Sequence, residues 1–151
     1  MRFLKYWLPL LAWMVFIFIG SGNLMSAEHT SRFIVPFLHW LLPRLSPETL
    51  EQIHVLIRKL GHVTEYAILS VLLWRAIFGG ITLKWSSSTT FFSAWFVCLI
   101  LAACDEFRQS FVASRGPSIW DVTIDSVGAA LGLGIYWCII RRRTEQSKNL
   151  S

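Results

Sequence analysis

The sequence is poor in charged residues. Asp, Glu, Lys and Arg make up only 15% of its 151 residues, whereas 54% of the residues are hydrophobic. A soluble domain usually carries about 25% charged residues. This deficit of charge argues against a soluble domain and indicates a membrane protein.

Cysteine is also scarce. The three Cys residues, Cys98, Cys104 and Cys138, lie in or beside hydrophobic runs. An odd number of cysteines in such places does not indicate a disulfide framework. We therefore expect all three to be small, buried hydrophobic residues.

The sequence lacks a basic patch with interleaved aromatic residues, although its net charge is +5. Such a patch is what single-stranded nucleic acid needs for base stacking, so we predict no nucleic-acid partner. The excess positive charge lies mostly near the two ends of the chain, at Arg2, Lys5, Arg141, Arg142, Arg143 and Lys148. Basic ends of this kind are typical of a membrane protein with a fixed orientation.

Four hydrophobic segments are long enough to cross a bilayer, which takes about 20 residues. Their approximate bounds are Phe3–Gly20, Ile57–Phe78, Thr89–Phe111 and Ile119–Ile140. The sequence therefore predicts an all-α fold, a multi-pass membrane bundle of four transmembrane helices. The first segment has the basic start of a cleaved signal peptide, but its hydrophobic run is longer than is usual there. We expect a retained helix.

The connection between the first two spans, residues 21–56, is not featureless. Its aromatic residues recur at helical spacing, and we interpret Phe37–Leu42 as an interfacial or re-entrant turn of helix with aromatic side chains at headgroup level. Ser46-Pro47-Glu48 has the cap, first-turn proline and acidic residue of a helix start. An amphipathic helix is thus expected to lead into the second span. We expect His39 and His54 to be interfacial or exposed.

All four spans are assigned to a single domain, residues 1–143, and the polar tail, residues 144–151, is expected to be disordered. Four spans place both termini on one side of the membrane. Because both termini are basic, that side is predicted to be the cytoplasmic side of the cell membrane. Several basic residues on the opposite side weaken this assignment without reversing it.

Polar residues gather at one end of three predicted spans. They lie near the start of the second span, the end of the third and the start of the fourth. Because successive spans alternate in direction, these ends share one side of the membrane, predicted to be the outer side. Ionisable groups inside a membrane mark functional sites. The candidate functional cluster comprises Lys59, His62, Glu65, Tyr66, Asp105, Glu106, Gln109, Arg115, Asp121 and Asp125.

The spacing of these residues favours side chains that face the interior of the bundle. His62 and Glu65 are three residues apart, and Asp121 and Asp125 are one helical turn apart. Gly128 and Gly132 continue nearly the same stripe, where a neighbouring helix could approach closely. Ordinary helix packing explains these glycines better than a functional site does.

Carboxylates in this layer need cationic partners. Arg58, Lys59, Arg108 and Arg115 can supply them. The alternative to a functional site is therefore an ion-pair network that only locks the helix ends together. Arg108, like Glu51, is expected to face water.

Several of these motifs resemble the VanZ-like family of bacterial membrane proteins. The resemblance covers about residues 10 to 140 and is carried by the order of KLGHVTEY (residues 59–66), DEFRQSF (105–111), Arg115 and DVTIDSVG (121–128). It implies a small multi-pass protein of the bacterial envelope, in a family whose founding member is associated with resistance to the glycopeptide teicoplanin. We carry over no catalytic residue and no cofactor from it.

Three functions remain open on the sequence. The first is binding of a polar or lipid-linked envelope ligand, such as a cell-wall precursor or a glycopeptide, with Lys59 and Arg115 contacting phosphate or carboxylate. The second is a membrane-embedded enzyme that acts on a lipid headgroup, with the His and carboxylate groups as acid, base or ligands for a divalent cation such as Mg²⁺. The third is a structural or partner subunit. Membrane lipids are expected partners, and an oligomer is possible.

Overall fold

The computed structural model describes residues 2–22, 26–80, 85–111 and 118–149, and within these ranges the chain forms helices joined by short turns and connections, with no strand. The helices are α1 (Arg2–Gly20), α2 (Ala27–Leu41), α3 (Pro47–Gly80), α4 (Ser87–Gln109) and α5 (Ile119–Asn149). Of these, α1, α3, α4 and α5 are long and hydrophobic enough to cross a membrane. The predicted all-α fold with four candidate spans is confirmed.

The helices differ in length from the predicted spans at two places. Helix α3 has 34 residues because the amphipathic lead-in that begins at Pro47 is continuous with the second span. Helix α5 has 31 residues and continues to Asn149, so residues 144–149 are helical where we expected disorder. An ion pair one turn apart, with Arg141 Nε 3.3 Å from Glu145 Oε1, accompanies this extension.

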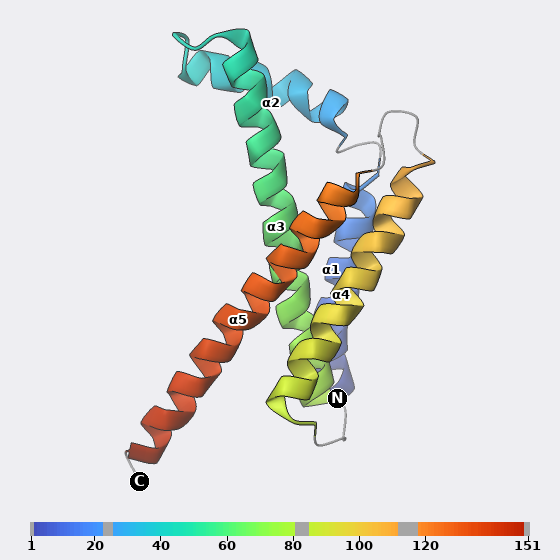
Figure 1. Ribbon diagram of the computed structural model, residues 1–151, viewed down its shortest axis with the longest axis vertical. Helices are drawn as coiled ribbons and strands as arrows, with labels where there is room; N and C mark the ends of the chain where they lie inside the picture. Colours follow the sequence, from blue (N-terminus) through green and yellow to red (C-terminus); the bar gives the residue numbers. More distant parts are fainter. Residues whose placement is uncertain (1, 23–25, 81–84, 112–117, 150–151) are drawn as a thin grey trace.

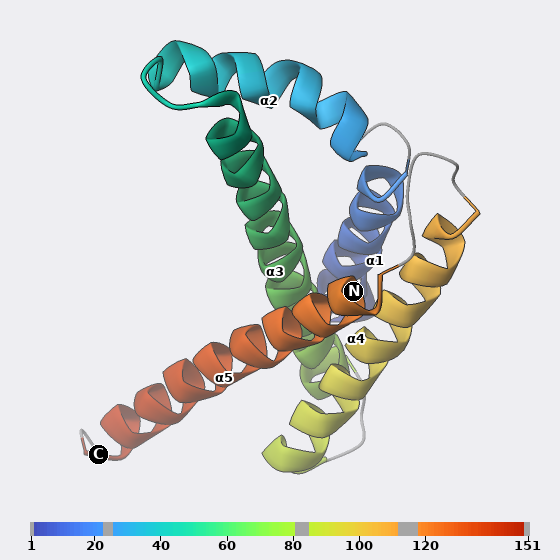
Figure 2. The same cartoon turned by 45° about the horizontal axis from the view of Figure 1, so that its top comes forward.

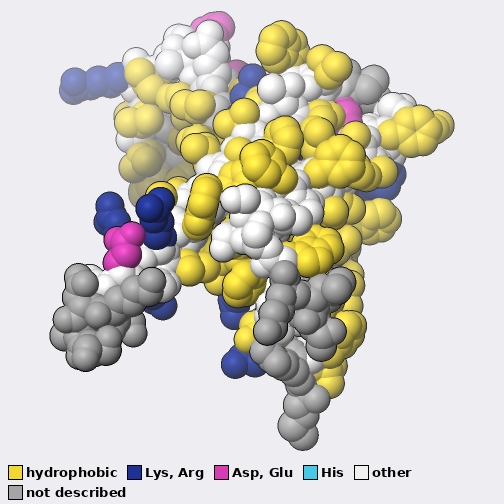
Figure 3. All heavy atoms as spheres, turned by 60° about the horizontal axis from the view of Figure 1, so that its bottom comes forward, with side chains coloured by type: hydrophobic (Ala, Val, Ile, Leu, Met, Phe, Trp, Pro, Cys, Tyr) yellow, Lys and Arg dark blue, Asp and Glu magenta, His cyan; other side chains and the backbone are white. Residues whose placement is uncertain are grey.

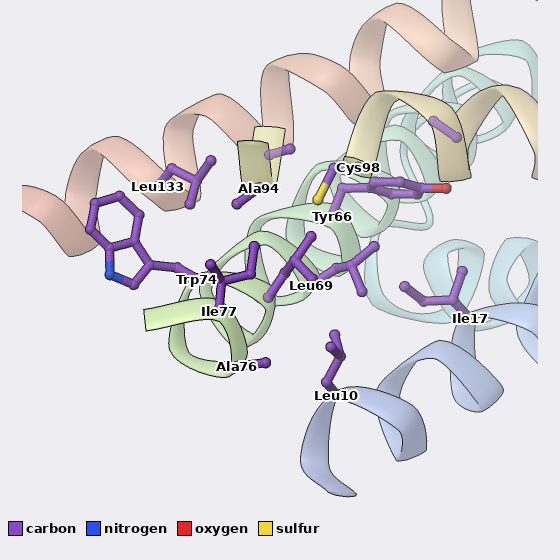
Figure 4. Close-up of a cluster of buried hydrophobic side chains, with 13 residues drawn as sticks. Leu10, Ile17, Tyr66, Leu69, Trp74, Ala76, Ile77, Ala94, Cys98 and Leu133 are labelled. Carbon is purple, nitrogen blue, oxygen red and sulfur yellow. The ribbon is translucent and has the colours of Figure 1, made fainter. Parts of the chain in front are cut away.

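Helix α3 is the centre of the bundle. It packs against α1, α4 and α5, and α4 packs also against α5. Buried side chains from all four helices meet along it, among them Leu10 of α1, Leu69 of α3, Cys98 of α4 and Leu133 of α5 (Figure 4). Of the cysteines, only Cys98 is buried as expected. Cys104 and Cys138 are exposed on the protein surface, where a membrane protein contacts hydrocarbon and a thiol meets no penalty.

Helices α3 and α5 cross with their backbones in contact. A Cβ atom added at Gly128 would lie 2.6 Å from the carbonyl oxygen of Val63, and one at Gly132 would lie 2.7 Å from Cα of Ala67. No side chain fits in that space. The close helix approach predicted from these glycines is therefore present.

Helix α2 is longer than the turn predicted at Phe37–Leu42. It begins at Ala27, because the Ser26 side chain caps it by accepting a hydrogen bond from the backbone N–H of His29. It crosses the start of α3 at one end of the molecule (Figures 1 and 2). Its aromatic side chains stay exposed, as expected of an interfacial helix: Phe33 is 77% and Trp40 75% exposed.

The expectation for His54 was wrong. Its side chain is buried between α2 and α3, with Nε2 3.1 Å from Oγ1 of Thr30 and Nδ1 3.4 Å from the Glu51 carboxylate. His39 is exposed, as expected. The sequence did not show the burial of His54 because the length of α2, which covers it, was underestimated.

Both ends of the described chain lie at one end of the molecule, and α2 lies toward the other (Figure 1). Hydrophobic side chains cover much of the surface shown in Figure 3. Large exposed hydrophobic residues on the four long helices fit lipid contact rather than contact with water.

Candidate functional site

Asp105, near the end of α4, is the centre of a polar group that reaches α1. Its Oδ1 accepts a hydrogen bond of 2.7 Å from the hydroxyl of Ser21, which follows α1, and its Oδ2 accepts one of 2.6 Å from the amide of Gln109. Oδ1 also lies 3.0 Å from Nη2 of Arg108. We call Ser21, Asp105, Arg108 and Gln109 the Asp105 group.

We expected Arg108 to face water, but its side chain instead bridges α4 to α1. In addition to Asp105, its Nη2 contacts the Ser21 hydroxyl and donates a 3.2 Å hydrogen bond to the carbonyl oxygen of Phe18. The guanidinium carbon also lies 4.3 Å from the centre of the Phe18 ring, which is a cation–π distance. Two contacts to backbone and ring therefore hold the guanidinium in place.

A second polar contact lies where α3 and α5 cross. Nδ1 of His62 is 3.3 Å from Oδ1 of Asp125, and the two side chains are 21% and 7% exposed. Oδ1 of Asp125 is buried and makes no regular hydrogen bond with the described part of the chain. The pair thus provides the main compensation for a carboxylate that is removed from water.

A third contact closes the end of α4 onto the start of α5. The Glu106 carboxylate accepts a 2.5 Å hydrogen bond from the backbone N–H of Ser118, just before α5 begins. Asp121 lies in the first turn of α5 and is half-buried. The carboxylate of Glu106 therefore satisfies a backbone donor at a helix start that would otherwise lack a partner.

The remaining residues of the predicted cluster are placed differently. Tyr66 is buried at 2% exposure. Glu65 is half-buried, and its backbone carbonyl accepts a 3.0 Å hydrogen bond from the indole of Trp13. Lys59 is exposed, and no described contact joins it to the other residues. Arg115 lies outside the described residues.

A groove of about 400 Å³ lies between α1, α3 and α4, beside the Asp105 group. Its walls include Leu11, Val15 and Phe18 of α1, Tyr66 and Leu69 of α3, and Leu101, Cys104, Asp105 and Arg108 of α4. We call it the lateral groove. It falls within the size range of small-molecule sites, about 300–1,000 Å³.

The lateral groove is polar at one end only. Helices α1 and α4 run in the same direction and α3 runs in the opposite one (Figure 1). Phe18, Arg108 and Tyr66 therefore mark one end, and the hydrophobic side chains of Leu11, Leu101 and Leu69 continue from it toward the other. An amphipathic molecule is likewise polar at one end and hydrophobic along the rest of its length.

The described residues hold no group of three or more His, Cys, Asp or Glu side chains close enough to bind a metal ion. The His62–Asp125 pair and the Asp105 group are separate contacts, on different helix pairs. The divalent-cation site considered for an enzyme therefore gains no support from the described geometry.

Sequence analysis missed the residues that tie the site to α1. Ser21 was assigned to a connection, and Phe18 to an ordinary span. The spacing of Asp105 and Arg108 at i, i+3 was a usable signal for their ion pair. No comparable signal links either residue to Ser21, because 84 positions separate Ser21 from Asp105.

The fold and site define a small helical membrane protein with four candidate spans and linked polar contacts beside a hydrophobic groove. The family model for VanZ/LLP1 matches residues 6–141, and the chain belongs to this family. No curated protein and no solved structure gives a significant match.

Proposed function

We propose that this VanZ-like protein binds an amphipathic molecule of the bacterial cell envelope, with the polar part of that molecule at the Asp105 group. The lateral groove is the observation that carries the proposal. It joins a hydrophobic wall to the Asp105–Arg108 ion pair within one volume. Binding sites of this kind are mostly hydrophobic, with a few placed polar groups that set orientation.

The proposal includes an orientation. Both termini lie at the end of the molecule away from α2, and both carry basic residues. By the charge rule this end is cytoplasmic. The polar end of the lateral groove, which points the other way, would then lie in the outer leaflet, where cell-wall precursors and glycopeptides are accessible. Through such binding the protein would contribute to teicoplanin-type resistance.

A structural role is the second candidate, and one observation favours it. Both carboxylate oxygens of Asp105 already accept hydrogen bonds from side chains of the protein. A carboxylate with its partners in place can fix a helix end without contacting any ligand. In that case the Asp105 group would serve to hold α1 against α4.

Teicoplanin susceptibility separates the two candidates. A sensitive bacterium would express the wild type, the double variant Asp105→Asn/Glu106→Gln, or the control Glu145→Gln, with membrane levels measured in parallel. Glu145 is exposed on α5 and far along the chain from the groove. Binding predicts that wild type and control protect while the double variant, at equal level, does not. Equal protection by all three would favour the structural role, and no protection by the wild type would contradict the resistance proposal.

A further inference from the structure

We propose that the ligand of the lateral groove is an anionic phospholipid that enters sideways from the bilayer, with its headgroup on Arg108 and one hydrocarbon chain along the groove. This inference rests on the proposed function and names the class of molecule bound. Three observations carry it: the side on which the groove is open, the exposure and hydrogen bonds of Arg108, and the hydrogen bonds that already occupy Asp105.

The groove is open toward the lipid. On α1, the wall residues Leu11, Val15 and Phe18 are 51%, 57% and 60% exposed. They belong to a helix long and hydrophobic enough to span the membrane, so their exposed sides face hydrocarbon. A ligand that reaches the groove from this side comes from the bilayer, and its chain exchanges one hydrocarbon contact for another.

Among the described residues that line the groove, Arg108 is the cation, and it lies at the polar end. Its Nε and Nη2 contact Asp105, Ser21 and the Phe18 carbonyl, whereas none of its described bonds uses Nη1. The side chain is 31% exposed, compared with 12% for Asp105. An arginine held in this way loses little freedom when it binds, and it contacts phosphate in a planar, directional manner.

Asp105 offers less to a cationic headgroup. Its Oδ1 accepts from Ser21 and Arg108, and its Oδ2 accepts from Gln109. The ammonium part of a zwitterionic lipid would therefore compete with donors that are already bonded. A headgroup whose net charge is negative meets the exposed Arg108 without that competition, so the groove should prefer it.

Photocrosslinking in detergent micelles tests this preference. The purified full-length protein would be mixed with phosphatidylglycerol or phosphatidylcholine, each carrying the same diazirine-labelled chain, and labelled peptides would be mapped by mass spectrometry. We expect the phosphatidylglycerol label on residues 11–18 and 101–104. We also expect about tenfold less labelling there with phosphatidylcholine, whose phosphate is the same but whose choline cation leaves the headgroup with no net charge to attract Arg108. Equal labelling by the two lipids would overturn the inference.

Three variants and two controls assign the contacts. Arg108→Gln should reduce phosphatidylglycerol labelling about tenfold and Arg108→Lys less than that, because the charge is kept but the fork is lost. The control Arg32→Gln, at an exposed ion pair on α2, should have no effect. Leu101→Trp should fill the groove and block labelling by both lipids, whereas Ile100→Trp, next to it but outside the groove lining, should not. Unchanged labelling in Arg108→Gln and Leu101→Trp would contradict the inference.

Unlabelled competitors separate this inference from the proposed function. Phosphatidylglycerol should displace the label. Displacement by a polyprenyl phosphate but not by phosphatidylglycerol would overturn the assignment to a bilayer phospholipid, yet leave envelope-ligand binding intact. If the groove takes no label but the Asp105→Asn/Glu106→Gln variant still loses teicoplanin protection, only this inference fails.

Discussion

The molecule joins its helices in two different ways. Helices α3 and α5 meet at the crossing through their backbones, whereas α1 and α4 are joined by side-chain contacts, which we call the α1–α4 link. At the crossing, Gly128 and Gly132 bring two backbones into contact, and His62 and Asp125 pair within it. At the link, side chains of Asp105 and Arg108 reach across to Ser21 and Phe18. The crossing leaves no space between the helices, whereas the link stands beside the lateral groove.

The difference indicates which part of the molecule can adapt its contacts. Backbone atoms in contact cannot move apart without loss of packing along both helices. Hydrogen bonds between side chains can exchange partners, at a net cost of about 1 kcal/mol each. We therefore regard the crossing as the fixed part of the bundle and the link as the adaptable part. The predictions below test this distinction.

The largest effect is expected at the crossing. Gly128→Leu would place a side chain against the carbonyl of Val63, and because a backbone atom cannot yield, the cost should reach or exceed the upper end of the ~1–3 kcal/mol range for overpacking. We expect little folded protein, measured by recovery from membranes and thermal unfolding in detergent. Gly134→Leu is the matched control, since an added Cβ there meets nothing within 4 Å. Equal stability of the two variants would contradict the assignment of the crossing as the fixed part.

His62→Ala should have the next largest effect. It removes the partner of a buried carboxylate, Asp125, whose Oδ1 has no regular hydrogen bond. We expect a loss of about 2 kcal/mol in the free energy of unfolding, the cost of an unsatisfied buried polar group. The second variant His62→Ala/Asp125→Leu should recover part of this loss, because no buried charge remains. Denaturation in mixed micelles measures both, and no recovery would show that the pair itself stabilises the crossing.

At the adaptable link, Asp105→Asn should cost less stability, about 1 kcal/mol. The amide can keep some of the hydrogen bonds but loses the ion pair with Arg108. Thermal unfolding in detergent would measure the loss. Our distinction between the two regions requires that this variant unfold at a higher temperature than His62→Ala, and the reverse order would contradict it.

Ser21→Ala should have the smallest effect. It removes one 2.7 Å hydrogen bond to Asp105, and because Arg108 and Gln109 still contact that carboxylate, the loss should be about 0.5 kcal/mol. The same melting assay resolves it when the exposed variant Arg141→Ala, expected to change stability by less than about 0.5 kcal/mol, is run as a reference. A loss as large as that of His62→Ala would mean that the link is as rigid as the crossing.

The sequence alone predicted the spans and the helix start at Pro47 because hydrophobic runs and capping residues act locally. It also grouped the polar residues at the ends of three spans, among which the structure pairs His62 with Asp125 and Asp105 with Gln109. The close approach at Gly128 followed from a spacing rule. Whether these residues form a working site stays a prediction.

The remaining features depend on tertiary contacts. Ser21 meets Asp105 only because α1 and α4 end at the same level, and no local pattern encodes that coincidence. His54 is buried because α2 covers it. The predicted turn began only at Phe37, whereas α2 begins ten residues earlier and contains Pro36, a residue that often interrupts helices. Tyr66 is buried, as its helical spacing favoured. The groove beside it is formed by residues of three helices, which no local pattern in the sequence brings together.

Helix α3 is longer than the hydrocarbon layer of a membrane is thick. Its 34 residues make a rod of about 51 Å at 1.5 Å per residue, whereas the hydrocarbon layer is about 30 Å thick. If α3 were perpendicular to the membrane, it would extend well beyond that layer, and if it were tilted, more of its length would lie within the layer. In either case α2 and the crossing are attached to the same helix. Helix α2 contacts α3 near its start through Thr30 and His54, and the crossing lies further along α3, at Val63. The tilt of α3, which depends on its packing as well as on the thickness of the surrounding membrane, would fix the height at which the polar end of the bundle sits.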